Sequence, residues 1–139
     1  MVKSSGTLNW PQDSGVYKEE AEFKPTNTVV APSGDIYVAG GYGLSYIHQY
    51  DSKLRRIRTW GGKGSEPGKL DCPHGIWLDT RGDQPILVVA DRSNARLQAF
   101  TLDGKHISFD PCRGLGHALQ ALSQLPLRSE AVEFMALDR

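Results

Sequence analysis

A small set of side chains in this 139-residue chain could bind a metal, chief among them its histidines and cysteines. Cys72 and His74 form a Cys-x-His pair, and Cys112 and His117 form a Cys-x4-His pair much later in the chain. Zinc sites do not ordinarily use this spacing. Two thiols without a secretory signal are also more often free than bridged. The pattern therefore disfavours a Cys–His metal site.

Tyr42 is the other side chain placed as if for chemistry, because it stands among Gly40, Gly41 and Gly43 at the end of a predicted strand. Glycine weakens a strand and marks a bulge, or a place where the backbone must come close to another group. A phenol held there could meet a ligand. It could equally be an amphipathic plug whose hydroxyl stays in water.

The one basic cluster surrounds a predicted hairpin tip and comprises Lys53, Arg55, Arg56 and Arg58. Sixteen basic residues balance sixteen acidic ones, so the formal net charge is zero. We therefore expect neither nucleic acid nor a membrane surface as a partner. A solvated turn is favoured over a phosphate-binding patch, since a real footprint would bias a whole face.

An internal repeat predicts the elements that position these side chains. Residues 25–60 align with residues 73–109, pairing Pro25 with Pro73, Gly34 with Gly82 and Tyr50 with Phe100. Four short antiparallel strands at a period of roughly 40–50 residues are the signature of a propeller blade. The fold class predicted is all-β, a partial β-propeller of two antiparallel four-stranded blades. The predicted strands are residues 28–31, 36–39, 46–50, 56–60, 76–79, 86–90, 96–100 and 106–109.

Three segments follow from the extent of the repeat. Residues 1–24 are an N-terminal extension with a possible outer strand around Val16 and Tyr17, residues 25–110 are the two blades, and residues 111–139 are a non-propeller, helical tail. In the tail, Leu115, Leu119 and Leu122 recur at helical spacing. Two interpretations remain open: an amphipathic tail over an apolar surface, or propeller sequence that has been cut or replaced. The second is slightly favoured, because the change falls where a blade should start.

The start of the chain has no apolar stretch of signal-peptide length, and no apolar run approaches the roughly 20 residues of a membrane span. A cytoplasmic protein is predicted from the sequence as written. An extracytoplasmic one is predicted if an upstream signal is missing.

The segments "PHGIWLD" and "ADRSNARLQAF" resemble the NHL-repeat family, and more closely the peptidyl-α-hydroxyglycine amidating lyases and their bacterial relatives. "GGYGLSYIHQYD" and "GGKGSEPGKLDCPHGIW" are similar to the bacterial group, and the resemblance covers roughly residues 8–110. It implies a six-bladed propeller with a zinc ion in its central channel, held by histidines from different blades. It also implies a peptidyl-α-hydroxyglycine substrate that is split into a peptide amide and glyoxylate.

Residue by residue, the resemblance makes His74 a zinc ligand, Arg92 a substrate-contacting arginine and Tyr42 the base. Zinc is the cofactor implied, with calcium as a second candidate ion. Gly40 departs from the family's aspartate, and Thr26 stands at the position equivalent to His74 in the other copy. A catalytic zinc takes about three protein ligands. This chain alone is therefore predicted to be inactive.

Structural alternatives stand beside these roles. His74 could be hydrogen-bonded to a neighbouring blade, and Asp91-Arg92 could brace a turn. The function predicted is a lyase-like NHL segment, not catalytically complete, that takes a peptide or a small carbonyl or hydroxyglycine substrate. The alternative is a non-enzymatic platform for peptide or protein, with RNA disfavoured by the net charge. Self-association is a further expectation, through open blade faces lined by Ile76, Leu78, Val88, Leu97 and Phe100.

Overall fold

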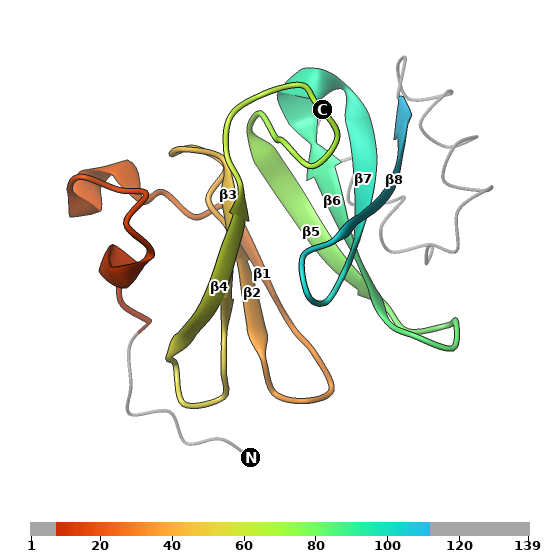
Figure 1. Cartoon of the computed structure of the whole chain (residues 1–139), viewed down its shortest axis with the longest axis horizontal. Coiled ribbons are helices and arrows are strands. Elements are labelled where there is room, and N and C mark those ends of the chain that lie inside the picture. Colours follow the sequence, from red (N-terminus) through yellow and green to blue (C-terminus); the bar gives the residue numbers. More distant parts are fainter. Residues whose placement is uncertain (1–7, 112–139) are drawn as a thin grey trace.

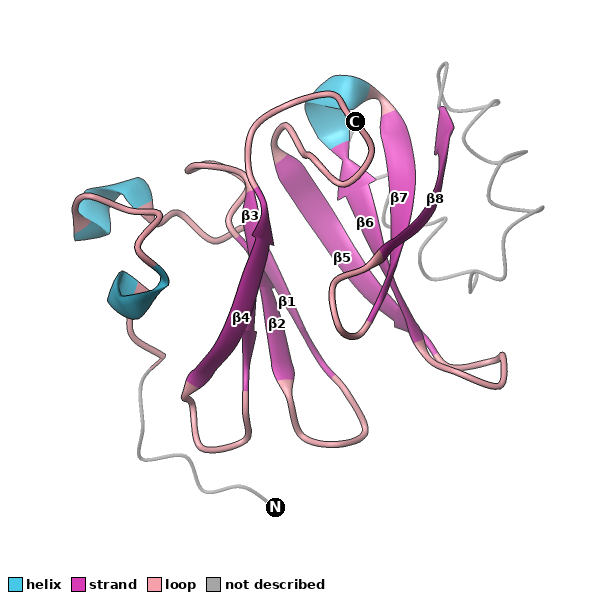
Figure 2. Cartoon of the chain, in the orientation of Figure 1, coloured by secondary structure: helices cyan, strands magenta, loops and turns pink. Residues whose placement is uncertain are grey.

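The computed structural model describes residues 8–111, which form two antiparallel four-stranded sheets (Figures 1 and 2). The all-β prediction and the eight strands are confirmed, with bounds that shift by a few residues. The predicted helical tail lies outside the described residues. The first sheet has the order β1 (Asn27–Val30), β2 (Ile36–Ala39), β3 (Tyr46–Tyr50), β4 (Arg56–Gly61). The second has the order β5 (Pro73–Asp79), β6 (Ile86–Asp91), β7 (Arg96–Thr101), β8 (His106–Pro111).

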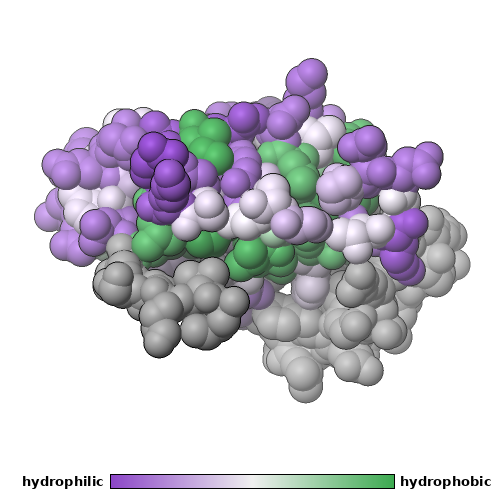
Figure 3. Space-filling model, turned by 90° about the horizontal axis from the view of Figure 1, so that it is seen from below, coloured by the Kyte–Doolittle hydropathy of each residue, from purple (hydrophilic) through white to green (hydrophobic). Residues whose placement is uncertain are grey.

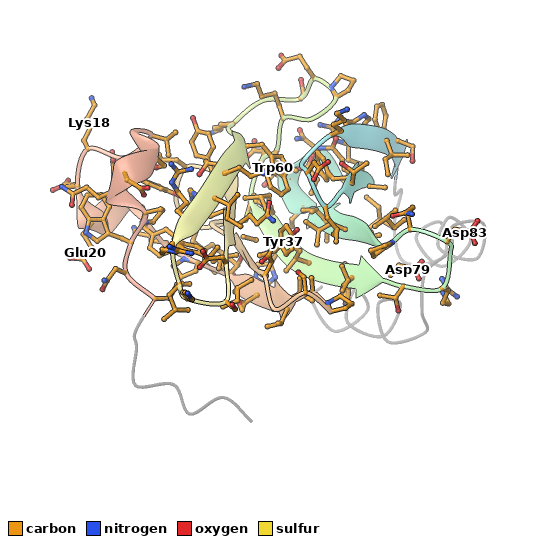
Figure 4. The ribbon with its side chains drawn as sticks, turned by 60° about the horizontal axis from the view of Figure 1, so that its bottom comes forward. Lys18, Glu20, Tyr37, Trp60, Asp79 and Asp83 are labelled. Carbon is orange, nitrogen blue, oxygen red and sulfur yellow. The ribbon has the colours of Figure 1, made fainter. Side chains whose placement is uncertain are left out.

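The core lies between the two sheets. Each sheet has two faces, and we call the face of the first sheet that meets the second its front face. Tyr37 and Trp60 lie on that face, between the sheets (Figure 4). The face of the second sheet that meets them is its back face. The core residues are Ala31, Tyr37, Ala39 and Ile47 from the first sheet and its turn, Leu70 from the connection, and Ile76, Leu87, Val89 and Phe100 from the second sheet.

The β3–β4 and β7–β8 hairpins close with the same turn, as the repeat predicts. Leu54 N donates to Asp51 O at 2.9 Å, and Gly104 N donates to Thr101 O at 3.0 Å. Both residues adopt the left-handed conformation, with φ of 67° at Leu54 and 85° at Gly104. Glycine fits this conformation without strain, whereas leucine does not. The first hairpin therefore carries local strain that the second avoids.

Replacing Leu54 with glycine is expected to raise the free energy of unfolding by roughly 0.5 kcal/mol. Relief of a left-handed strain of about 1–2 kcal/mol outweighs the added backbone entropy of glycine. Urea unfolding measures the change. The reciprocal control is Gly104→Ala, where the new Cβ would lie 2.8 Å from the Trp60 ring and should lower the urea midpoint. A lower midpoint for Leu54→Gly would contradict the argument.

The N-terminal segment, residues 8–24, forms no strand, so the expectation of an outer strand around Val16 and Tyr17 is wrong. Two short 3-10 helices stand there instead, η1 (Gln12–Ser14) and η2 (Glu20–Glu22). The reason is that Tyr17 packs on the back face of the first sheet. Tyr17 is 7% exposed, and its ring contacts those of Tyr46 and His48, with centroids 6.2 and 5.5 Å away. The segment therefore covers the back face of the first sheet without pairing with its edge.

The three arginines of the basic cluster each face a carboxylate. Arg55 pairs with Asp51 at 2.8 Å, and Arg56 pairs with Asp13 at 3.0 Å. Arg58 lies 3.5 Å from Asp103 of the second sheet. These pairs neutralise the arginines locally, which favours the solvated-turn interpretation over a phosphate-binding patch.

Seen from below, the described surface is largely hydrophilic, with hydrophobic residues showing mainly in its central band (Figure 3). Within residues 8–111, no helix has the length and apolar character needed to cross a membrane.

Candidate functional site at the junction of the two sheets

The two sheets meet where the residue before β1 and the β2–β3 connection touch the start of β5, a place we call the junction. Thr26 Oγ1 donates to Pro73 O at 2.7 Å, and Cys72 N donates to Ser45 Oγ at 3.1 Å. A Cβ at Gly41 would overlap Pro73 O and crowd Thr26. These contacts explain the glycine, because only a residue without a side chain lets the two backbones come so close.

Tyr42 and His74 come together across this junction. The Tyr42 hydroxyl lies 2.6 Å from His74 Nε2, and the two rings stand edge to face with centroids 5.3 Å apart. Which of the two atoms donates depends on the histidine tautomer. Tyr42 is 57% exposed, so the pair is open to a ligand in solution.

Local backbone contacts hold both side chains. Tyr42 N donates to Lys24 O at 3.3 Å, and a Cβ at Gly43 would overlap Glu22 O. His74 sits where the register between β5 and β6 shifts, between Pro73 and Gly75. The phenol is thus fixed by the first sheet and the N-terminal segment, and the imidazole by the second sheet.

Arg92 lies at the same end of the second sheet. It begins η3 (Arg92–Asn94), directly after β6, and its backbone N–H donates to Cys72 O at 3.3 Å. Its side chain is exposed. The structure therefore joins two of the three predicted site residues by a hydrogen bond and places the third on the turn beside the start of β5.

Asp91 braces the turn as the structural alternative proposed, but the arginine that pairs with it is Arg96 and not Arg92. Asp91 is 0% exposed and accepts hydrogen bonds from Asp71 N at 2.7 Å and from Arg96 Nε at 2.7 Å. Asn94 Nδ2 and Gln98 Nε2 also donate to it, at 2.9 and 3.0 Å. We call these four side chains, Asp91, Asn94, Arg96 and Gln98, the Asp91 network.

The Asp91 network holds the connection that leads to the junction. Arg96 donates to Ser65 O at 2.8 Å, Glu66 O at 3.1 Å and Lys69 O at 3.0 Å. Gln98 Nε2 donates to Lys69 O at 2.6 Å. Arg96 and Gln98 were not predicted from the sequence to have this role. The signal available was a charged and an amide side chain at alternate positions of β7, among the apolar residues Leu97, Ala99 and Phe100.

The described residues do not assemble a zinc site. Within residues 8–111, no three histidine, cysteine, aspartate or glutamate side chains cluster closely enough to hold a metal ion. His48 lies elsewhere, buried on the back face of the first sheet, and His106 is on β8. His117 and Cys112 fall outside the described part of the chain. A catalytic zinc takes three protein ligands, and calcium takes six to eight oxygens. His74 as a metal ligand stays a prediction.

Comparison with known proteins adds relatives to this geometry. The chain is 35% identical over 115 residues to the peptidylglycine alpha-amidating monooxygenase of Rattus norvegicus, in an alignment covering 74% of this chain and 11% of that protein. It is 36% identical over 88 residues to a probable peptidyl-alpha-hydroxyglycine alpha-amidating lyase of Caenorhabditis elegans, covering 60% of this chain and 24% of the lyase. The human NHL repeat-containing protein 3 is 30% identical over 99 residues, covering 69% of this chain and 28% of that protein.

The chain is a homologue of the amidating enzymes and of NHL-repeat proteins. This confirms the predicted relationship, although no family model matches the sequence. This chain spans only about a tenth of the length of the rat and mouse enzymes that it matches. A closer kinship with bacterial members of the group stays a prediction.

Proposed function

We propose that the two sheets are adjacent blades of an NHL-type β-propeller, and that their junction carries part of a lyase-like site. The substrate class is a peptidyl-α-hydroxyglycine or a similar small hydroxyglycine or carbonyl compound. The observation that carries the proposal is the exposed pair of Tyr42 and His74, 2.6 Å apart, contributed by different sheets. The support from relatives is that one similar protein is named as an amidating lyase for such a substrate.

Each residue has a role that its chemistry supports. Arg92 can hold a terminal carboxylate by paired charge-assisted hydrogen bonds. The Tyr42 phenol can exchange a proton with a bound hydroxyl group, and His74 can take or return that proton through their shared hydrogen bond. Because the described residues place one histidine, His74, at the junction, where a catalytic zinc takes three protein ligands, we propose that this chain alone does not turn over the substrate.

A second candidate function is a platform that binds peptide or protein without catalysis. The observation that favours it is the same Tyr42, which is 57% exposed at a junction where residues 8–111 supply no full set of metal donors. An exposed aromatic ring with a polar tip is a common anchor for peptide partners.

Substrate binding tests the site. A peptidyl-α-hydroxyglycine titrated into the purified full chain is expected to bind saturably, and Arg92→Ala should weaken binding by tenfold or more, since a hydrogen bond to a charged group contributes about 1.5–3 kcal/mol. Calorimetry measures the affinity. The matched control is Arg55→Ala, because Arg55 is an exposed arginine on the β3–β4 turn, where it pairs with Asp51. It should leave the affinity unchanged.

The same samples separate the candidates. Binding of ordinary peptides as tightly as the hydroxyglycine compound would favour the platform. If neither the hydroxyglycine compound nor ordinary peptides bind, the junction is not a binding site for this class of ligand. Chelator-sensitive release of glyoxylate by the purified chain would show that the site is complete, contrary to our proposal.

A further inference from the structure

The second sheet has a front face of its own, which the repeat identifies. In the first sheet, Ala39 pairs with Ile47 and Ile47 pairs with Trp60, and all three pack in or against the core between the sheets. The equivalent pair in the second sheet is Ala90 with Leu97. Successive strand residues point to opposite faces, so this pair lies on the face opposite Val89 and the core. The second sheet thus repeats the surface with which the first sheet packs on its neighbour.

The centre of this front face is apolar, whereas the register places Asp79, Ser108 and Asp110 at its margins. Val88 and Leu97 are each 1% exposed, Ala90 is 5% exposed and Ala99 is 7% exposed. None of the four belongs to the core between the sheets. The register places them together with Gly75 and Trp77 on one side of β5, β6 and β7. A face of this composition is stable in water only when something covers it.

We propose that residues 112–139 of the same chain, the tail segment, cover the front face of the second sheet. The described chain ends at Pro111 on β8, and β8 is the outer strand of this very sheet, so the tail segment starts beside the face. It contains Leu115, Leu119 and Leu122 at a spacing that puts them on one side of a helix.

The width of the front face matches the length of a helix that the tail segment could form. Four strands about 4.8 Å apart make a face about 14 Å wide, and a helix of eleven residues is about 16 Å long. One helix over residues 115–125 would therefore cross the whole face.

The tail segment also has an advantage over a second copy of the chain. It is covalently attached through β8, so its effective concentration at the face is in the millimolar range. A second copy at micromolar concentration would have to displace it. The tail segment then closes a surface that would otherwise bind another sheet of the same kind.

Methyl NMR on the unaltered full chain tests the contact directly. We expect nuclear Overhauser effects between the methyl groups of Val88 or Leu97 and those of Leu119 or Leu122, and none to Ile57 on β4. Mixing labelled with unlabelled chains separates the occupants. Effects that appear only between different molecules would assign the face to a second copy and overturn the proposal, as would their complete absence.

A charge-matched pair of variants gives a second readout. The double substitution Leu119→Asp with Leu122→Asp should uncover the face, increase the fluorescence of a hydrophobic dye several-fold and make the chain sediment as a dimer or larger species. The control, Gln120→Asp with Gln124→Asp, adds the same charge to the polar side of the predicted helix and should behave as the unaltered chain. Equal behaviour of the two variants would overturn the proposal. If the leucine variant fails to fold, the NMR contacts decide.

Discussion

Replacing Asp91 with alanine is expected to lower the free energy of unfolding by about 3–5 kcal/mol. The carboxylate is fully buried and accepts four hydrogen bonds, and its partner Arg96 is only 8% exposed. Removing one member of a buried ion pair leaves the other charge in a poorly solvating interior. A typical domain is stable by only about 5–15 kcal/mol, so the variant should unfold at a much lower urea concentration.

Urea unfolding of Asp91→Ala beside Asp103→Ala checks this expectation. Asp103 also faces an arginine, Arg58 at 3.5 Å, but its side chain is 73% exposed. An exposed pair contributes about 0–1 kcal/mol, so the control should stay close to the unaltered chain. Adding Arg96→Met to Asp91→Ala should restore part of the stability, because it removes the stranded charge. Equal losses for the two aspartate variants would show that the Asp91 network does not hold the connection.

The second large effect is an expected loss of folding stability at acidic pH. His48 is 0% exposed, with Nε2 at 2.8 Å from the Tyr17 hydroxyl and Nδ1 at 2.8 Å from Thr59 Oγ1. Burial, with a smaller contribution from the nearby Arg56 charge, lowers the pKa of His48 from 6.5 to about 4. The unfolded chain therefore takes up the proton first as pH falls. The contribution of neutral His48 to the free energy of unfolding is therefore complete above pH 6.5. It declines as the pH falls toward 4, by about 3 kcal/mol in total.

The internal repeat supplies the variant for this test. Gln98 occupies in the second sheet the position of His48 in the first, so His48→Gln replaces a titrating side chain with one that a homologous face accommodates. Between pH 7 and pH 4.5, the unaltered chain should lose roughly 2–3 kcal/mol more stability in urea than His48→Gln.

His106 is the control for the acid test. Burial also lowers the pKa of His106, but its side chain is less buried than that of His48. His106→Gln should therefore keep most of the pH dependence. A His48→Gln variant as acid-sensitive as the unaltered chain would show that this buried imidazole does not control the response.

The strands could be predicted from the sequence because the signals that define them are local. The glycine turn at Gly34 and Gly82 and the alternation of apolar residues recur in both copies, so each copy supports the prediction made from the other. The position of the N-terminal segment could not be predicted, because it depends on a contact between Tyr17 and His48, which is 31 residues away in the sequence. A tyrosine in a segment of mostly polar residues carries no sign of that contact.

The candidate site could likewise be predicted only in part from the sequence. Tyr42 and His74 could be singled out from the glycines and the family resemblance, but their hydrogen bond depends on how the two sheets meet. Arg96 and Gln98 were missed because a polar residue alternating with apolar ones is ordinarily expected to face water. Here the chain itself, through Ser65, Glu66 and Lys69, supplies the hydrogen-bond partners that water would have supplied.

The contact at Gly41 also sets an angle. The inner strands β1 and β5 lie side by side at this point, where the backbone of Gly41 faces Pro73 and Thr26 with no room for a methyl group. Any larger residue would push the inner edges apart and change the tilt of one sheet on the next. A single glycine therefore sets how closely, and at what tilt, the two sheets pack, and its replacement would change that tilt while leaving the strand pairing within each sheet intact.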